Sequence, residues 1–79
     1  MSRQAIQKAV FEELRQSGRP MSVRELLERI RRERPEFKQV ADFDLRSAVL
    51  AMTAIGAIES TPTNQVAVRA AEPAAAARG

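Results

Sequence analysis

The sequence predicts an α+β fold in which a three-helix bundle is followed by a C-terminal two-stranded β-hairpin. Two observations predict it. Apolar residues recur at helical spacing in three successive segments, each followed by glycine or proline, and after residue 56 they alternate instead in steps of two. The 79 residues suffice for one domain, which we place at residues 1–69, followed by a tail at residues 70–79.

The first helix is expected at residues 2–17. Ser2 can accept a hydrogen bond at the start of this helix. Gly18 can end it, because glycine adopts the left-handed conformation at low cost, and Pro20 prevents its continuation. The apolar stripe of the helix consists of Ile6, Val10 and Leu14.

The second helix begins with the clearest local signal in the chain. Ser22 and Glu25 have the spacing of a capping box, in which each side chain accepts a hydrogen bond from the backbone N–H group of the other residue. The helix is expected to end before Pro35, because a proline disfavours helical backbone in the residue that precedes it. Its apolar face comprises Val23, Leu26, Leu27 and Ile30.

A connector at residues 35–43 precedes the third helix. The helix is expected to start near Asp42 or Asp44, either of which can cap it, and to end at Gly56. Three apolar side chains of the connector are expected against the core: Phe37, Val40 and Phe43. The inner face of the helix comprises Leu45, Ala48, Val49, Met52 and Ile55.

The last predicted element is a β-hairpin. Residues 57–61 and 65–69 alternate in polarity, and the intervening Pro-Thr-Asn sequence at 62–64 favours a turn. Alternation places three side chains on the core face: Ile58, Val66 and Val68. The tail at 70–79 is rich in alanine and interrupted by proline, so we expect it to be disordered.

The composition argues against catalysis. The chain has no His, Cys or Tyr, and its three glycines are isolated, so neither a common general base nor a phosphate-binding loop is present. We therefore expect no catalytic residue, no metal site and no cofactor. No run of 18 apolar residues occurs, and the N-terminus is too polar for a secretory signal. These features predict a cytoplasmic protein without a membrane span.

Three stretches resemble the winged helix-turn-helix superfamily. They are the turn at 18–26, the third helical segment at 44–52 and the helix-to-strand junction at 54–59. The resemblance extends over residues 3–69 and implies a short strand near Met21 that pairs with the hairpin. It also implies a bacterial-type DNA-binding protein whose third helix enters the major groove while the hairpin contacts the DNA backbone.

DNA is therefore the first partner that the sequence suggests. Residues 29–38 carry a local excess of +3, equal to the net charge of the whole chain. Arg29 and Arg32 each follow a glutamate by four residues, which favours ion pairs within the helix. The candidates for phosphate contacts are the cations without such a glutamate, together with the arginine that ends the hairpin: Arg31, Arg34, Lys38 and Arg69. The candidates for the groove are Arg46, Ser47 and Thr53.

The outward face of the third helix also supports a different hypothesis. A helix that reads base edges is expected to present Arg, Asn, Gln or Lys, whereas this face is mostly apolar. Leu50 and the alanines could contact thymine methyl groups, the face could instead dock against a protein partner or a second copy of the chain, or Leu50 could be a single exposed leucine without a function. The residues of this alternative interface are Ser47, Leu50, Ala51 and Ala54.

Overall fold

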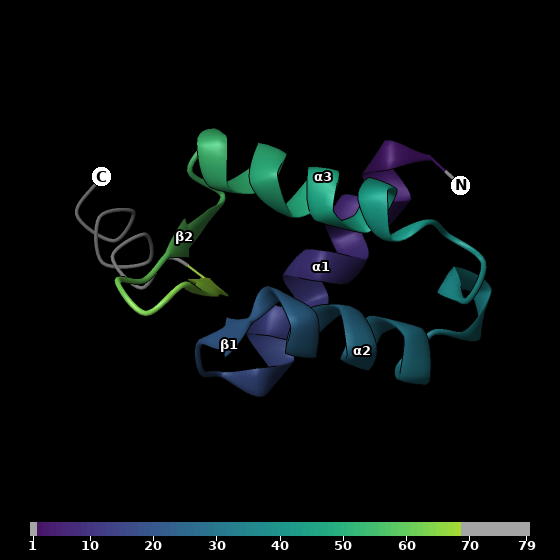
Figure 1. The fold of residues 1–79 in the computed structure, drawn as a ribbon, viewed down its shortest axis with the longest axis horizontal. Helices are drawn as coiled ribbons and strands as arrows, with labels where there is room; N and C mark the ends of the chain where they lie inside the picture. Colours follow the sequence, from purple (N-terminus) through teal and green to yellow (C-terminus); the bar gives the residue numbers. More distant parts are fainter. Residues whose placement is uncertain (1, 69–79) are drawn as a thin grey trace, which may run out of the picture.

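The computed structural model describes residues 2–68, and these form three α-helices, a short 3-10 helix and a three-stranded sheet (Figure 1). The elements in chain order are α1 (Arg3–Ser17), β1 (Met21–Ser22), α2 (Val23–Glu33), η1 (Pro35–Phe37), α3 (Asp42–Ala54), β2 (Ile58–Ser60) and β3 (Gln65–Val68). The predicted α+β layout of three helices and a C-terminal hairpin is confirmed. The predicted tail at 70–79 lies outside the described residues, as does Arg69.

Local signals set the start and end of α1 as predicted. The Ser2 hydroxyl accepts a hydrogen bond from the backbone N–H of Ala5 at 3.1 Å. Gly18 follows the helix with φ at 66°, a left-handed conformation that favours glycine. The N–H of Gly18 donates to the carbonyl of Leu14, so the last turn of the helix is satisfied by the residue that ends it.

The start of α2 uses half of the predicted capping box. The Ser22 hydroxyl accepts from the N–H of Glu25 at 3.1 Å. The Glu25 carboxylate does not close the box, because it binds the guanidinium of Arg19 at 2.7 Å instead. A cation in the preceding turn therefore competes successfully with the backbone for this carboxylate.

The end of α3 is a Schellman motif centred on Gly56, which has φ at 81°. The N–H of Gly56 donates to the carbonyl of Thr53, and the N–H of Ala57 donates to that of Met52. These two bonds satisfy carbonyls that have no partner within the helix, and they turn the chain towards β2.

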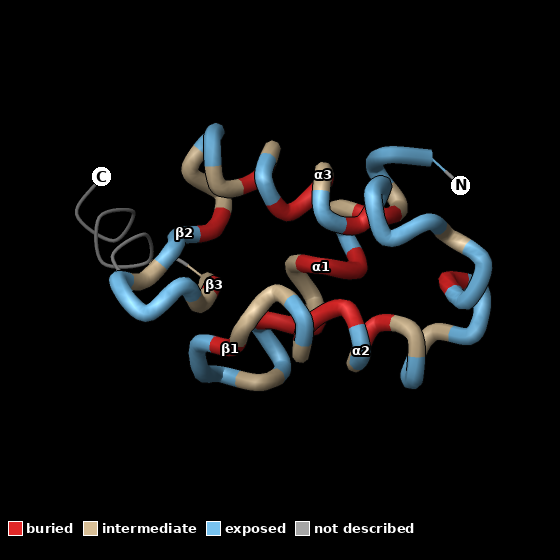
Figure 2. The backbone as a smooth tube through the Cα atoms, in the orientation of Figure 1, coloured by how far each residue is buried: buried red, intermediate tan, exposed pale blue. Residues whose placement is uncertain are grey.

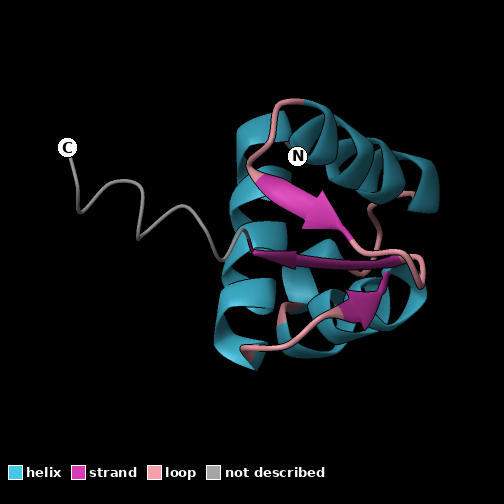
Figure 3. Cartoon of the chain, turned by 90° about the vertical axis from the view of Figure 1, so that its left-hand side faces the viewer, coloured by secondary structure: helices cyan, strands magenta, loops and turns pink. Residues whose placement is uncertain are grey.

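The sheet is antiparallel, with β3 between β1 and β2 (Figure 3). Met21 pairs with Val66, so β1 is the short strand that the resemblance implies. The hairpin turn is closed by hydrogen bonds between Thr61 and Gln65, and Asn64 adopts a left-handed φ of 63°. A three-residue loop with a left-handed residue before the second strand is a common hairpin connection.

The core lies where the inner faces of the helices meet the sheet (Figure 2). α1 crosses between α2 and α3, and the sheet covers one end of the helices (Figures 1 and 3). The predicted orientation of the hairpin is confirmed, since Ile58 and Val66 are buried and Val68 packs against the core. The largest fully buried apolar side chains are Leu14, Met21, Leu26, Ile30, Leu45, Ile58 and Val10.

Three predictions about the ends of α3 are wrong. Neither aspartate caps the helix, because the cap residue is Ala41 and both aspartates already lie in the first turn. Phe43 is exposed rather than buried, since the helix includes it and 100° per residue turns it away from Leu45. Ile55 is also exposed, because it ends the helix and Ile58 fills the core there instead.

Candidate functional site

The arginines of α2 meet carboxylates of α1 around a buried glutamate. Glu13 is 1% exposed and is the only buried charged residue between residues 2 and 68. Its Oε1 atom lies 3.4 Å from Nε of Arg29, and its Oε2 atom lies 3.2 Å from Nε of Arg34. Arg34 also binds Glu12 at 3.0 Å. Both oxygens of the buried carboxylate are thus used to fix the C-terminal half of α2 against α1.

The sequence of α1 contains a signal for this cluster. On a helical projection of α1, Glu13 falls between Ala9 and Val10, inside the arc of residues that faces the core. A carboxylate at such a position loses its hydration, which costs free energy unless cations or hydrogen-bond donors bind it. The two arginines from α2 supply these cations, 16 and 21 residues further along the chain.

Arg31 ties α2 to the start of α3. Its guanidinium binds Asp42 at 2.6 Å and donates to the backbone carbonyls of Phe37 and Lys38. Arg46 approaches the other oxygen of the same aspartate at 3.9 Å. Arg31 and Arg46 are therefore the predicted site residues that the fold brings together, and a carboxylate lies between them.

These contacts correct our interpretation of the basic segment. Arg31 and Arg34 are not without partners, since carboxylates from other parts of the chain neutralise both. The expected ion pairs of Arg29 with Glu25 and of Arg32 with Glu28 do not form. Instead, Glu25 binds Arg19, Glu28 binds Arg24 and Arg29 binds Glu13 and Glu33.

Two cations near the end of α2 do remain exposed. Within residues 2–68, neither Arg32 nor Lys38 has an ionic partner. Lys38 is the residue that follows η1, in the connector before α3, and the fourth phosphate candidate, Arg69, lies outside the described residues. The four predicted phosphate contacts therefore do not form one described surface.

The groove candidates on α3 offer few free hydrogen-bond donors. The Thr53 hydroxyl donates to the carbonyl of Val49 at 2.9 Å, one turn earlier in the same helix. Ser47 is half-buried, and Arg46 leans towards Asp42. Arg46 and Ser47 are thus the polar side chains of this set that could still reach a ligand.

Charge is distributed unevenly along the fold. Residues 2–38 contain ten basic and six acidic side chains, a net charge of +4. Residues 42–68, which include α3 and the hairpin, contain one basic and three acidic side chains, a net charge of −2. The helix and hairpin that the resemblance places against DNA therefore form the part of the described chain that has a net negative charge.

The outward face of α3 is apolar. We define this apolar face by Phe43, Ser47, Leu50 and Ala54, which fall within about 60° of one another on a helical projection of α3. Phe43, Leu50 and Ile55 are 77%, 71% and 75% exposed, and they are the large hydrophobic residues on the surface of residues 2–68. Phe43 and Leu50 share one face of α3 and Ile55 directly follows the helix, which distinguishes them from the scattered exposed leucines that any protein has.

The sequence identified part of this apolar face. Ser47, Leu50 and Ala54 were predicted from helical periodicity, and all three lie on it. The predicted Ala51 is half-buried and lines a groove between α3 and the start of α1 instead. Phe43 also lies on this face, and Ile55 follows it at the end of the helix, although both are predicted core residues.

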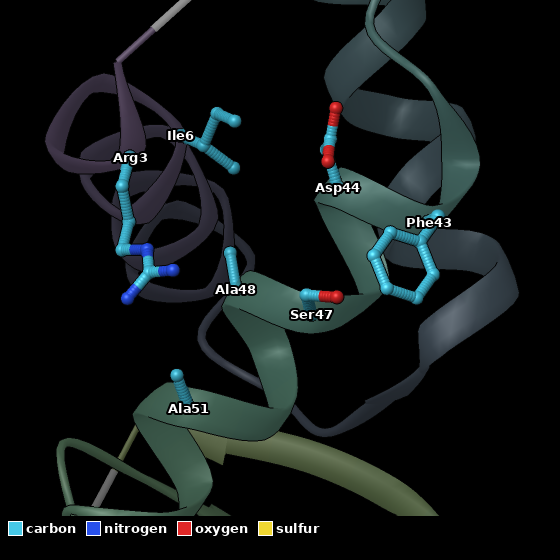
Figure 4. Close-up of a pocket in the computed structure, with 7 residues that line it drawn as sticks. All are labelled: Arg3, Ile6, Phe43, Asp44, Ser47, Ala48 and Ala51. Carbon is cyan, nitrogen blue, oxygen red and sulfur yellow. The ribbon is translucent and has the colours of Figure 1, made fainter.

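The groove beside the apolar face has a volume of about 410 Å³ and is shown in Figure 4. Arg3 extends from α1 towards Ala48 and Ala51, while Asp44 lies at the other end of the groove (Figure 4). In the described part of the chain, neither the Arg3 guanidinium nor the Asp44 carboxylate has an ionic partner. Opposite charges without partners thus lie along one edge of the apolar face.

No group of three acidic side chains within residues 2–68 is arranged to hold a metal ion. None of the described helices is long and apolar enough to cross a membrane.

Comparisons of the chain with protein-family models, curated protein sequences and solved structures found no match. We therefore infer function from the geometry and charge of the described residues.

Proposed function

We propose that this chain is a non-catalytic winged-helix module that docks onto protein through the apolar face of α3. One observation carries the proposal: the large exposed hydrophobic residues of the described chain gather on the outer face and C-terminal end of α3. In the winged-helix superfamily, which the sequence resembles, the corresponding helix usually enters the major groove of DNA. The same fold also serves unrelated functions, so the site and not the fold indicates the partner.

The spacing of the apolar face suits contact with another helix. Phe43, Ser47, Leu50 and Ala54 follow one another at intervals of four, three and four residues, which is the pattern of a helix that packs along its length. Burying a side chain the size of leucine or phenylalanine contributes about 1.5–3 kcal/mol. Phe43 and Leu50 are two such side chains, and both gain this free energy when a docking partner covers them.

DNA binding is the second candidate, supported by Arg32 and Lys38, which are exposed and without ionic partners among residues 2–68. Two observations weigh against it. Arg31 and Arg34 would have to leave their carboxylates to reach phosphates, and α3 with the hairpin carries a net charge of −2. A DNA-reading surface is expected to carry a positive excess.

Backbone NMR titrations distinguish the two candidates. The first titrant is a random DNA duplex at low and high salt. The second is an uncharged amphipathic peptide with leucines at helical spacing. Protein docking predicts that the peptide shifts the amide resonances of residues 42–56 and that the duplex leaves them unchanged. Shifts in α3 caused by the duplex and not by the peptide would overturn the proposal in favour of DNA binding.

A matched pair of variants makes this test specific. Leu50→Asp places a charge at the centre of the apolar face and should abolish the peptide-induced shifts. Gln16→Asp adds the same charge at an exposed position of α1 and should leave them unchanged. Peptide binding that survives Leu50→Asp would show that the apolar face of α3 is not the docking site.

A further inference from the structure

We infer that the occupant of the apolar face is a second copy of this chain, bound so that the two α3 helices run antiparallel. The inference deepens the proposed function and rests on it. Two observations carry it: the order of large and small residues along the face, and the two unpaired charges at its edge.

Large and small residues alternate along the apolar face. The order is Phe43, Ser47, Leu50 and Ala54. In an antiparallel pair with Ser47 opposite Leu50 of the other copy, Phe43 lies opposite Ala54, so each large residue meets a small one. Helices pack most closely when large and small side chains alternate across facing positions. A parallel pair would instead set Phe43 against Phe43 and leave gaps at Ser47 and Ala54.

The edge of the face is complementary in charge in the same arrangement. Asp44 lies near the start of α3, and Arg3 lies beside Ala48 and Ala51, between one and two turns further along the helix (Figure 4). Reversing the second helix brings the Asp44 carboxylate of one copy towards the Arg3 guanidinium of the other. The twofold axis repeats this contact, as an isologous interface requires.

The size of the face predicts a weak dimer. A helix of 13 residues is about 20 Å long, which provides less contact than an interface of standard size. We therefore expect a reversible dimer with a dissociation constant at or above about 1 µM. Residues 70–79 are a poorer occupant, because their sequence offers alanine, glutamate, proline, arginine and glycine but no large apolar side chain.

Sedimentation equilibrium of the full chain, from low micromolar to millimolar concentration, tests the dimer. The wild-type chain should dimerise reversibly, and Gln16→Asp should dimerise equally well. Leu50→Asp should stay monomeric, with circular dichroism reporting that it remains folded. A wild-type chain that is monomeric at millimolar concentration overturns the inference, as does a dimer that Leu50→Asp leaves intact.

Exchange of the two edge charges tests the contact between Asp44 and Arg3. Asp44→Arg and Arg3→Asp should each weaken the dimer several-fold, and the double variant should recover most of the loss. Lys8→Asp changes an exposed cation of α1 away from the groove and should have little effect. Additive losses in the double variant would overturn this contact.

Single cysteines report the orientation, because the chain has none of its own. In the antiparallel pair, two copies of position 54 lie about 16 Å apart along the helix axis, whereas two copies of position 47 lie about 5 Å apart. Mild oxidation should therefore cross-link Ser47→Cys and not Ala54→Cys. Efficient cross-linking of both variants would overturn the antiparallel arrangement.

The inference and the proposed function fail in different ways. A monomeric chain whose α3 resonances still respond to the amphipathic peptide contradicts only the second copy as partner. A chain whose α3 responds to duplex DNA and not to the peptide contradicts protein docking itself.

Discussion

The inner faces of α2 and α3 are both apolar, but their outer faces differ in chemical character. Leu26 and Ile30 of α2 are fully buried, as is Leu45 of α3. The outer side of α2 carries charges, and most of its arginines bind carboxylates. The outer side of α3 exposes Phe43 and Leu50. Both helices therefore contribute to one core, but only α3 leaves a large apolar surface uncovered.

The difference shows that charge density along a sequence is a poor guide to a binding surface. Around Arg29 to Lys38 the sequence has an excess of +3. The fold then supplies Glu13, Glu12 and Asp42 from elsewhere in the chain and neutralises much of that excess. No comparable contact within residues 2–68 covers Leu50, so the outward face of α3 stays exposed.

The largest expected effect tests whether the inner faces are equivalent. Leu26→Ala in α2 and Leu45→Ala in α3 should each lower the free energy of unfolding by about 2–5 kcal/mol, because each leaves a cavity in the core. In a domain of this size, each 1 kcal/mol corresponds to a fall of roughly 4–8 °C in Tm. Urea and thermal denaturation measure both. A loss below 1 kcal/mol in only one variant would show that the two helices do not share the core equally.

The buried carboxylate gives the next largest effect. Glu13→Ala should destabilise the fold by about 2–3 kcal/mol, since it leaves Arg29 and Arg34 partly buried without the hydrogen bonds of their shared partner. Glu12→Ala removes a single ion pair that is more exposed to solvent, and it should lower the free energy of unfolding by less than about 1 kcal/mol. Equal losses of unfolding free energy in the two variants, measured by urea denaturation, would show that the burial of Glu13 does not determine how much this cluster contributes to stability.

A smaller change in stability distinguishes an arginine of α2 that binds a carboxylate, Arg31, from one that has no ionic partner within residues 2–68, Arg32. Arg31→Ala should cost about 1 kcal/mol, because it removes the bonds to Asp42 and to the connector carbonyls. Arg32→Ala should stay within about 0.5 kcal/mol of the wild type. Hydrogen exchange should show faster opening of residues 35–42 in the first variant alone. The same exchange pattern in both variants would argue against a tethering role for Arg31.

The smallest expected effect is on the outer face of α3. Leu50→Ala, studied at concentrations low enough for a monomer, should change stability by no more than about 0.5 kcal/mol. The same substitution at Leu45, five residues earlier in the helix, provides the matched comparison with a buried side chain. A loss at Leu50 as large as that at Leu45 would mean that this face is covered in the folded monomer.

The sequence by itself determined the elements and most of their ends. Ser2, Gly18, Ser22 and Gly56 act at the positions that their residue types predict, and the change of period after Gly56 correctly predicts the hairpin. Such signals are readable because caps and turns depend on hydrogen bonds between residues a few positions apart. Periodicity also identified Ser47, Leu50 and Ala54 as outward residues of the candidate interface.

Only the tertiary structure decided which charges and which apolar residues remain free. The partners of Glu13 lie 16 and 21 residues away, so no local spacing rule could pair them. Phe43 is exposed because α3 begins one residue before it, and Ile55 is exposed because α3 ends at the residue that precedes it. A shift of one or two residues at a helix end changes the direction in which a side chain points. Burial and ion pairing depend on how distant segments of the chain pack together. The exposed residues of the candidate interface are therefore known only once the fold is known.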